Sequence, residues 1–596
     1  MAGNANFPVW TDLIFSDQSL GTQVITNAGR KYSNTAGGAE IAGYADTRIP
    51  REGKWYWEVY ISSRGSSTAS VGVVSEKNHY EQYSTSKSFF EYTGPGSHDN
   101  EKPLYGATGT VWYGDSSTLS SQGTWTTGDI IGVAVDADNN KIFWAKNNTW
   151  INSANPSTGT TGGITINYDP SDNFLCLPAI MGYQSPVFTC NFGQDSSFCG
   201  EKSTGTANSA DGNGYGDFYY APPTNYLALC SANQPVPAAI DPSQDDSVTA
   251  TSFHKTGIYT GTGTTKNITG LGFQPDMVWI SQRTTNTTAQ NYMFDSSRGV
   301  QKYVLINSNG VQVTDSNSLT AFGTDGFTLG SSSAVNSSSA PDTFVFAAWK
   351  INGGTTATNT SGTITSTVQA NQDTGMSIVQ YTSTGTDGTV GHGLSKPLDW
   401  YFIKKATNQD RDKLGYARTS GPSRFMYFGD RNTAFSTDTG LWSNTDPTST
   451  VFSIDGGTTE VNSPAGIVYH AYCFHSVPGF SSFGNYYGNA NADGAFIPLD
   501  FTPSMVILKQ IGGTDDWGMY TNPTQSNPGT NPLDKVQRYD STNGEQSGTG
   551  RLIDFLAGGF KLRTNNATFN EGDYYFYAAW GRLPTKFPNA FGGDFG

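Results

Sequence analysis

The stretch GLGFQPDMVWI, residues 270–280, decides the fold of the second half of the chain, because its design recurs twice. GHGLSKPLDWYFIKK (391–405) and FIPLDFTPSMVILKQ (496–510) also lead through a proline into a short apolar strand. A proline at the start of a strand interrupts no ladder hydrogen bond. Each proline stands 16 residues after a tyrosine, which pairs Tyr259 with Pro275, Tyr381 with Pro397 and Tyr487 with Pro503. This equal spacing indicates three copies of one unit.

The three copies continue to match one another beyond the proline. Each continues with an aromatic strand, a turn that contains asparagine, and a closing aromatic strand. The asparagines are Asn336, Asn462 and Asn570, and the closing strands end at Trp349, Phe474 and Trp580. The prolines recur after 122 and then 106 residues, whereas solenoid units are about 20 to 50 residues long. A block of about 110 residues can hold its own core, so we expect three tandem, separately folding antiparallel β-domains at 251–375, 376–480 and 481–596.

The first part of the chain shows the two-residue period of strands. KWYWEVYIS (54–62) places Trp55, Trp57 and Val59 on one side. DIIGVAVDADNNKIFWAKNNTW (129–150) contains strands separated by polar turns at 138–140 and 147–148, a pattern typical of hairpins. Long stretches with the 3.6-residue period of a helix are hard to find. The sequence therefore predicts an all-β protein.

These segments also carry a family resemblance. Together with SVGVVSEK (70–77), LCLPAI (175–180) and FTCNFGQ (188–194), in this order, they resemble the SPRY domain, a concanavalin-like sandwich of two antiparallel sheets. The resemblance implies a jelly-roll-like β-sandwich over 1–202. Residues 203–250 are rich in turn residues at both ends and aromatic in the middle, so we expect a connector whose centre packs against a neighbour.

The second half is similar to an uncharacterised tandem repeat found in structural proteins of tailed bacteriophages. The matching segments include GLGFQPDMVWI, DSSRG (295–299), DGFTLG (325–330), FAAWK (346–350) and NTDPTSTVFSI (444–454). The resemblance implies a component of the phage particle, with no reaction attached to it. The third copy departs most, since it has FIPLDFTP where the second has GHGLSKP.

Charge and composition exclude several kinds of partner. The 596 residues include 34 Lys and Arg against 50 Asp and Glu, a net charge of −16, which opposes binding to nucleic acid or to anionic membranes. The sequence predicts neither a signal peptide nor a spanning helix, and hence a protein made in the host cytoplasm and remaining soluble. We expect the five cysteines to be buried thiols, with Cys190 and Cys199 the only pair close enough in sequence to consider.

Known catalytic and metal motifs fit poorly. YHAYCFH (469–475) places Cys473 and His475 on one face of a strand, but zinc needs four ligands and only His392 is a conceivable addition. DADNNKIFWAKN (136–147) lacks the glycine and the glutamate of a calcium loop. GTGTTKN (261–267) lacks the end of a phosphate loop, and G-x-S-x-G does not occur. We predict no enzyme, no cofactor and no metal site, although catalytic groups assembled in space and calcium in another loop stay open.

Aromatic residues near a long polar insertion are the candidate binding site. They lie in or beside residues 81–110 and are Tyr80, Tyr83, Tyr92, Tyr105 and Trp112. Flat rings surrounded by Asn, Asp and Gly suit sugars, because a ring stacks on the apolar face while polar groups bond the hydroxyls. The alternative is that part of this set merely holds the loop in place.

The expected function joins these features. We expect a virion structural protein, a tail or capsid-attached fibre whose loops bind a host-surface glycan. Its partners would be other virion proteins and further copies of itself, as a homotrimer. A decoration or adaptor protein without receptor binding is the main alternative, and a polysaccharide-degrading enzyme is the third.

Overall fold

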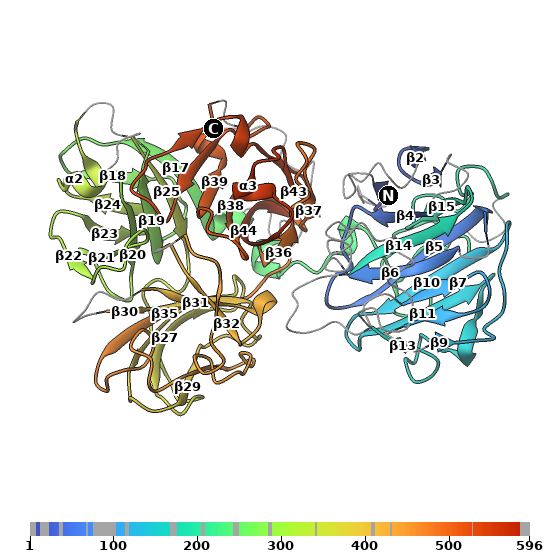
Figure 1. Cartoon of the computed structure of the whole chain (residues 1–596), viewed down its shortest axis with the longest axis horizontal. Helices are drawn as coiled ribbons and strands as arrows, with labels where there is room; N and C mark the ends of the chain where they lie inside the picture. The colour runs from blue at the N-terminus through green and yellow to red at the C-terminus, as the bar shows by residue number, and fades with distance from the viewer. Residues whose placement is uncertain are drawn as a thin grey trace.

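The structure is a computed structural model, and it is nearly all β (Figure 1). It describes residues 7–11, 23–34, 40–66, 69–75, 103–113, 118–166, 176–203, 209–241, 249–283, 289–339, 343–406, 412–429, 432–526 and 529–584. Within these ranges, no helix has the length and apolar character needed to cross a membrane. A β-sandwich at the N-terminus is followed by three β-repeats that lie around a common centre.

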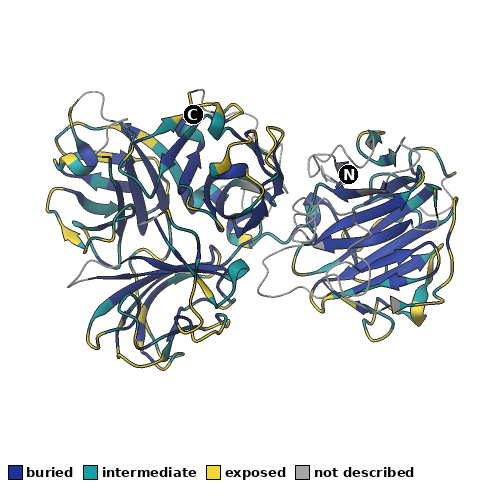
Figure 2. Ribbon diagram, viewed as in Figure 1, coloured by how far each residue is buried: buried dark blue, intermediate teal, exposed yellow. Residues whose placement is uncertain are grey.

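The N-terminal domain is a sandwich of two antiparallel sheets, whose strands are buried while the connecting turns are exposed (Figure 2). In order across the first sheet, the strands are β1 (Trp10–Thr11), β4 (Glu40–Ala45), β14 (Cys176–Tyr183), β6 (Ser70–Ser75), β7 (Leu104–Gly106), β8 (Val111–Trp112) and β9 (Thr118–Leu119). Across the second sheet they are β12 (Thr149–Trp150), β11 (Lys141–Lys146), β10 (Ile130–Asp136), β5 (Lys54–Ser63), β15 (Val187–Asn191), β3 (Lys31–Asn34) and β2 (Gln23–Thr26). β13 (Ile164–Thr165) pairs with β11.

The central strand β5 confirms the predicted alternation. Trp55, Trp57 and Val59 enter the core between the two sheets, whereas Tyr56 faces outward into a second apolar cluster. Strands β10 and β11 pair from Ile131–Lys146 to Asp136–Lys141, which is the hairpin expected from the sequence.

The connector packs on the outer face of β5. β16 (Leu227–Ala228) pairs in parallel with Trp55 and Tyr56, and Phe218 and Tyr226 complete the outer cluster. Glu58 is buried beneath this segment, and its carboxylate accepts hydrogen bonds from the backbone N–H groups of residues 219 and 220 at 2.9 and 2.8 Å. Burial raises the pKa of Glu58 to about 7 although these and two side-chain donors oppose the shift.

Each of the three repeats pairs its strands in the same order. The large sheet of the first repeat contains β17 (His254–Thr260), β25 (Thr343–Trp349), β19 (Met277–Gln282), β20 (Asn291–Asp295), β21 (Lys302–Leu305) and β22 (Val313–Thr314). The second contains β26 (Ala357–Asn359), β27 (Ser366–Asn371), β28 (Met376–Thr382), β35 (Val468–Phe474), β30 (Trp400–Lys405), β31 (Leu414–Ala417), β32 (Arg424–Tyr427) and β33 (Ser436–Thr437). The third contains β36 (Ser481–Tyr487), β44 (Tyr574–Pro584), β38 (Phe501–Gln510), β39 (Gly518–Thr521), β40 (Lys535–Arg538) and β41 (Gln546–Ser547).

A small sheet covers one face of each large sheet. Its strands are β18 (Lys266–Thr269), β24 (Gly326–Leu329) and β23 (Leu319–Gly323) in the first repeat, β29 (Gly388–Gly391) and β34 (Val451–Ile454) in the second, and β37 (Phe496–Pro498), β43 (Gly559–Leu562) and β42 (Ile553–Leu556) in the third. The helices are short: α2 (Ser333–Asn336) and α3 (Ala567–Asn570), with 3₁₀ turns η2 (Ile151–Ser153), η3 (Ser231–Asn233), η4 (Ala238–Ile240), η5 (Ala250–Ser252), η6 (Arg418–Ser420), η7 (Asn522–Thr524) and η8 (Thr549–Arg551).

The central strands of the large sheets are buried on both faces. In β30, Tyr401 and Ile403 enter the repeat's own core beneath its small sheet. Trp400 and Phe402 point the other way, into a core that all three repeats share. Because side chains alternate along a strand, each sheet supplies one face to its own core and the other to the shared core.

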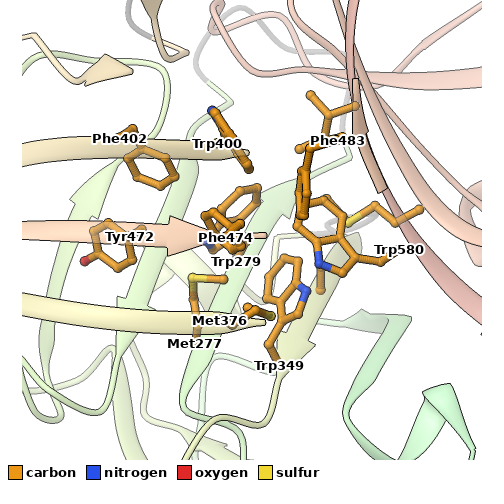
Figure 3. Close-up of a cluster of buried hydrophobic side chains, with 14 of the residues drawn as sticks. Met277, Trp279, Trp349, Met376, Trp400, Phe402, Tyr472, Phe474, Phe483 and Trp580 are labelled. Carbon is orange, nitrogen blue, oxygen red and sulfur yellow. The ribbon is translucent and has the colours of Figure 1, made fainter. Parts of the chain in front are cut away.

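The shared core is aromatic. Trp400 of the second repeat lies 5.8 Å from Phe483 and 6.4 Å from Trp580 of the third, between ring centroids. Trp580 lies 5.3 Å from Trp349 of the first repeat. Figure 3 shows these rings converging from strands of all three repeats. Three tandem β-domains are therefore confirmed, but their separate folding is not what the packing shows: they form one ring, residues 249–584, around a common centre.

Polar contacts close this three-repeat ring. Between the first and second repeats, Arg298 Nε bonds Asp295 Oδ2 at 2.8 Å and the Tyr472 hydroxyl at 3.0 Å. The hydroxyl of Thr419, in the second repeat, donates to the Asn485 amide oxygen of the third at 2.7 Å. The third repeat returns to the first where Arg283 Nε meets Glu545 Oε2 at 2.7 Å. DSSRG, one of the segments of the phage-repeat resemblance, thus lies at an interface between repeats.

Two details differ from the expectations. The boundary set at residue 375 falls inside one sheet, since β27 pairs with β28, so the second repeat gains strands from residue 357 onward.

The tyrosine that matches Tyr259 and Tyr381 is Tyr486 and not Tyr487. The rings of Tyr259, Tyr381 and Tyr486 stack on the closing strand, and their hydroxyls donate to the carbonyls of residues 335, 461 and 569. The third copy has one extra residue between tyrosine and proline, which the equal spacing concealed.

Candidate functional site

The aromatic residues predicted to bind sugar do not form one exposed surface in the described part of the chain. Tyr80, Tyr83 and Tyr92 lie outside the described residues. Tyr105 is fully buried in the sandwich core, and its hydroxyl donates to the carbonyl of Gly123 at 2.5 Å. Trp112 is half-buried and packs against a cluster that includes Phe496 of the third repeat. These two rings serve packing, which is the alternative that the sequence left open.

The histidines of the described chain are poor candidates for general bases. Burial lowers the pKa of His254 and of His470 to about 3 and that of His392 to about 4. A general base acts best with a pKa near the working pH. These side chains therefore remain neutral and weakly basic at pH 7.

The motifs weighed for metals serve packing and turns. Cys473 enters the core of the second repeat, and all five cysteines are free thiols. Asp136 pairs with Lys54 at 2.7 Å and accepts a hydrogen bond from the amide of Asn139. Across the described ranges, His, Cys, Asp and Glu side chains nowhere gather in groups of three that could hold a metal ion.

A cavity of about 250 Å³ lies where the first domain meets the ring. The turn after β4, residues 47–52, forms one wall, and residues 234–235 of the connector form another. The second repeat contributes the segment just before β30 and the turn after β35, and the third contributes the start of β36 and Asp500. Residues far apart in the sequence therefore build this junction cavity.

Basic side chains outnumber acidic ones along its walls. The cations are Arg48, Arg51, Lys396 and Arg418, and the carboxylates are Glu52, Asp399 and Asp500.

Asp399 organises the basic side chains. Its Oδ1 lies 3.9 Å from Arg51 Nη1 and 3.8 Å from Arg418 Nη1, while Oδ2 accepts the backbone N–H of Ser476 at 2.7 Å. Lys396 Nζ and Glu52 Oε2, both half exposed, lie 3.7 Å apart and mark the solvent side. One guanidinium from the first domain and one from the second repeat thus converge on a single carboxylate.

The remaining wall is polar on one side and apolar on the other. His475 is 4% exposed, its Nδ1 bonds the Ser476 carbonyl at 3.0 Å, and its Nε2 has no hydrogen-bond partner. Burial lowers the pKa of His475, so the ring is neutral. Phe483, Leu499 and several prolines provide the apolar surface. Burial also raises the pKa of Asp500 to about 6, against a backbone hydrogen bond from Gly479.

In the first repeat, backbone groups surround the aspartate at the corresponding position. Asp276, which corresponds to Asp399, accepts hydrogen bonds from the backbone N–H groups of residues 351, 353 and 354 at 2.7 to 2.9 Å and from the Ser296 hydroxyl. Asp399 has one backbone donor and two distant guanidiniums instead. In the sequence, Pro397 stood out in the opening motif of the second repeat and His475 only as a conceivable zinc ligand. Nothing marked Arg51, because only the fold brings these segments together.

Comparison with known proteins identifies both parts of the chain. Residues 54–161 match the SPRY domain family, and residues 249–584 match a domain of unknown function, DUF7483. No curated protein matches the chain.

Solved structures that are similar to the first domain include the SPRY domain of human HERC1, at 20% identity over 28% of this chain and 91% of that one, with a TM-score of 0.21. A second human SPRY domain gives 18% identity over 28% and 93% of the two chains, with a TM-score of 0.20. The stonustoxin structure is 11% identical over 31% of this chain and 27% of that one, with a TM-score of 0.22. The match over 249–584 takes in more than half of the 596 residues, and the protein therefore belongs to the DUF7483 family, with a SPRY domain at its N-terminus.

Proposed function

We propose that this chain is a non-enzymatic structural protein of a bacteriophage particle, part of a tail or capsid-attached fibre that binds a glycan on the host surface. The closed three-repeat ring carries the proposal. It buries the faces of three sheets in one aromatic centre and holds the SPRY domain at its rim, where the junction cavity lies. Such a platform suits a protein that presents a binding surface outside the cell. The connection to phage particles comes from the resemblance of the repeats.

Binding is better supported than catalysis by the chemistry of the described residues. The buried histidines are weak bases, and the junction cavity combines hydrogen-bonding groups with an apolar wall. Sites for small polar ligands typically have this mixture. A polysaccharide-degrading enzyme would release new reducing ends from host envelope glycans, and we expect none from this protein.

Assembly would involve other virion proteins and further copies of this chain. The ring satisfies its three repeat contacts within one chain. A homotrimer must therefore use surfaces outside these contacts. Light scattering of the full chain at micromolar concentration tests this part, and a monomer would count against it.

The proposal is tested on the particle and on the host cell. Antibodies raised against residues 249–584 should label free distal tips in electron micrographs, and the purified chain should bind host cells and lose binding when their surface glycans are stripped. Labelled sites that lie within the particle, with no cell binding, would instead assign the chain to an adaptor or decoration role without a receptor.

A further inference from the structure

We propose that the junction cavity binds one acidic sugar residue, with its carboxylate on the arginines and a hydroxyl on His475. This inference rests on the proposed glycan-binding function and names the class of glycan. It locates binding between the domains, on residues other than the aromatic set that the sequence suggested.

The charge of the cavity fits a single negative charge. Four basic side chains against three carboxylates leave one net positive charge, in a chain whose net charge is −16. A carboxylate carries one negative charge, whereas a phosphate monoester carries about 1.5 to 2 at pH 7. Guanidinium groups bind carboxylates in a planar, two-bond geometry. The cavity therefore matches a carboxylate better than a phosphate group.

His475 favours a ligand that can donate a hydrogen bond to its Nε2 atom. The neutral ring donates through Nδ1 to the Ser476 carbonyl, which leaves Nε2 as an acceptor without a partner. A buried acceptor with no hydrogen bond is costly, at about 1 to 3 kcal/mol. A sugar hydroxyl satisfies it, and a plain carboxylate cannot, because it has no proton to donate at neutral pH.

The apolar wall and the volume fit a sugar ring. Phe483 and Leu499 are buried at the cavity, with Pro50 and Pro478 beside them. A pyranose has an apolar C–H face that such a wall can cover. About 250 Å³ is below the range of about 300 to 1,000 Å³ that holds drug-sized ligands. The cavity thus has room for one sugar residue and not for an extended chain of sugars.

Binding there would join the two parts of the molecule. Arg51 comes from the first domain, whereas Arg418 and His475 come from the second repeat. Arg48 reaches further, to the Tyr577 hydroxyl of the third repeat at 3.3 Å. A ligand that contacts both sides stabilises the docked arrangement by mass action.

The test is calorimetric titration of the full chain with D-glucuronate, D-glucose and D-gluconate. Glucuronate should bind, and glucose, which lacks the carboxylate, should bind at least tenfold more weakly. Gluconate, an open-chain hydroxy acid, should also be weaker. Equal binding of gluconate would assign the cavity to free hydroxy acids and overturn the sugar-residue proposal.

Two variants test the location. Arg51→Ala should weaken glucuronate binding at least tenfold, and His475→Phe should weaken it while leaving a ring in place. Arg563→Ala is the matched control, because its side chain is 43% exposed against 45% for Arg51 and its ion pairs lie away from the cavity. Unchanged affinity in Arg51→Ala, with circular dichroism showing a native fold, would overturn the site.

Failure of the site and failure of the function give different results. A chain that binds host glycans but shows no glucuronate binding overturns the cavity proposal and leaves the proposed function intact. A chain that binds glucuronate in the cavity but does not bind host cells supports the site and overturns the proposed function.

Discussion

At the scale of single residues, three buried asparagines do the same work in the three repeats. Asn336, Asn462 and Asn570 are fully buried. The side-chain oxygen of each accepts a backbone N–H at 2.8 to 2.9 Å, from the loop after β17, β28 and β36 respectively. Their recurrence was visible in the sequence. Their burial was not, because asparagine in a turn is usually exposed and bonds its own backbone.

Asn570→Ala should destabilise the ring by about 3 kcal/mol. Its amide nitrogen donates to the carbonyls of Asn491 and Thr564 at 2.8 and 2.6 Å, and their loss leaves buried groups unpaired, at about 1 to 3 kcal/mol each. Urea unfolding followed by tryptophan fluorescence measures the change. Asn565→Ala, an exposed position in the same loop, is the control and should change stability by less than about 0.5 kcal/mol. Equal effects would contradict the role given to Asn570.

His254 should make the ring sensitive to acid. Its folded pKa is about 3 against about 6.5 in the unfolded chain. Between these values the unfolded chain binds a proton that the folded chain does not, so stability is lost as the pH falls below about 6.5. At pH 4.5 the loss from this residue is about 3 kcal/mol, since one pKa unit corresponds to about 1.4 kcal/mol.

The replacement that tests this comes from the second repeat. Met376 faces Phe474 as His254 faces Trp349, so His254→Met keeps an apolar side chain that the fold already accepts. The urea midpoint of the variant should fall less between pH 7 and pH 4.5 than that of the wild type. An identical fall in both proteins would show that other groups cause the acid sensitivity.

At the scale of strands, the sequence predicted the pairs well and the packing incompletely. Period two indicates which residues share a face, and this held for Trp55 and Trp57 in β5. It does not show what covers each face. In β30 every residue is buried, so the strand WYFIKK has no exposed face. The apolar residues on both of its faces were the sign in the sequence that a second core covers this strand. Nearly continuous apolar runs are typical of strands covered on both sides.

Gly429, just after β32, lies where segments of all three repeats approach one another. Its φ is +68°, and a Cβ atom there would lie 2.6 Å from the Ile306 carbonyl oxygen of the first repeat and 3.1 Å from that of Tyr539 in the third. Gly421 has a similar φ of +72° with open space around it. Gly421→Ala should cost about 1 to 3 kcal/mol from backbone strain alone, because its φ of 72° and ψ of 172° suit only glycine.

Gly429→Ala should cost at least about 2 kcal/mol more, because the atoms it meets are backbone and the repeats must separate. Thermal unfolding of both variants measures the difference. If both variants lose the same stability, the close packing of the three repeats does not make glycine necessary at position 429.

At the scale of the whole molecule, the sequence revealed the number of units but not their relation. Tandem copying indicates domains in a row, and each repeat does have its own core. The ring closes only because the third repeat meets the first, between residues more than 200 apart such as Arg283 and Glu545. The junction cavity depends on the same long-range packing, which is why its arginines could not be found from local patterns.

A single repeat should not behave as an independent domain. Residues 357–480 alone would expose Trp400, Phe402, Tyr472 and Phe474, which the ring buries, and apolar patches of this kind drive association. We expect this fragment to self-associate into species of varied size and to bind a hydrophobic dye, whereas residues 249–584, which bury these side chains, should keep one defined size without binding the dye. Size-exclusion chromatography with light scattering measures both. A compact, dye-negative monomer of the single repeat would restore the view of separately folding modules.

The difference between Asp276 and Asp399 illustrates what covalent linkage permits. In an assembly of identical subunits, every substitution appears three times, so an opening made for a guest molecule would weaken all contacts together. Here each copy has its own stretch of gene, so the second repeat could differ at Asp399 while the first repeat has a turn that closes on Asp276. Specialisation of one third of a symmetrical scaffold is thus available without harm to the rest.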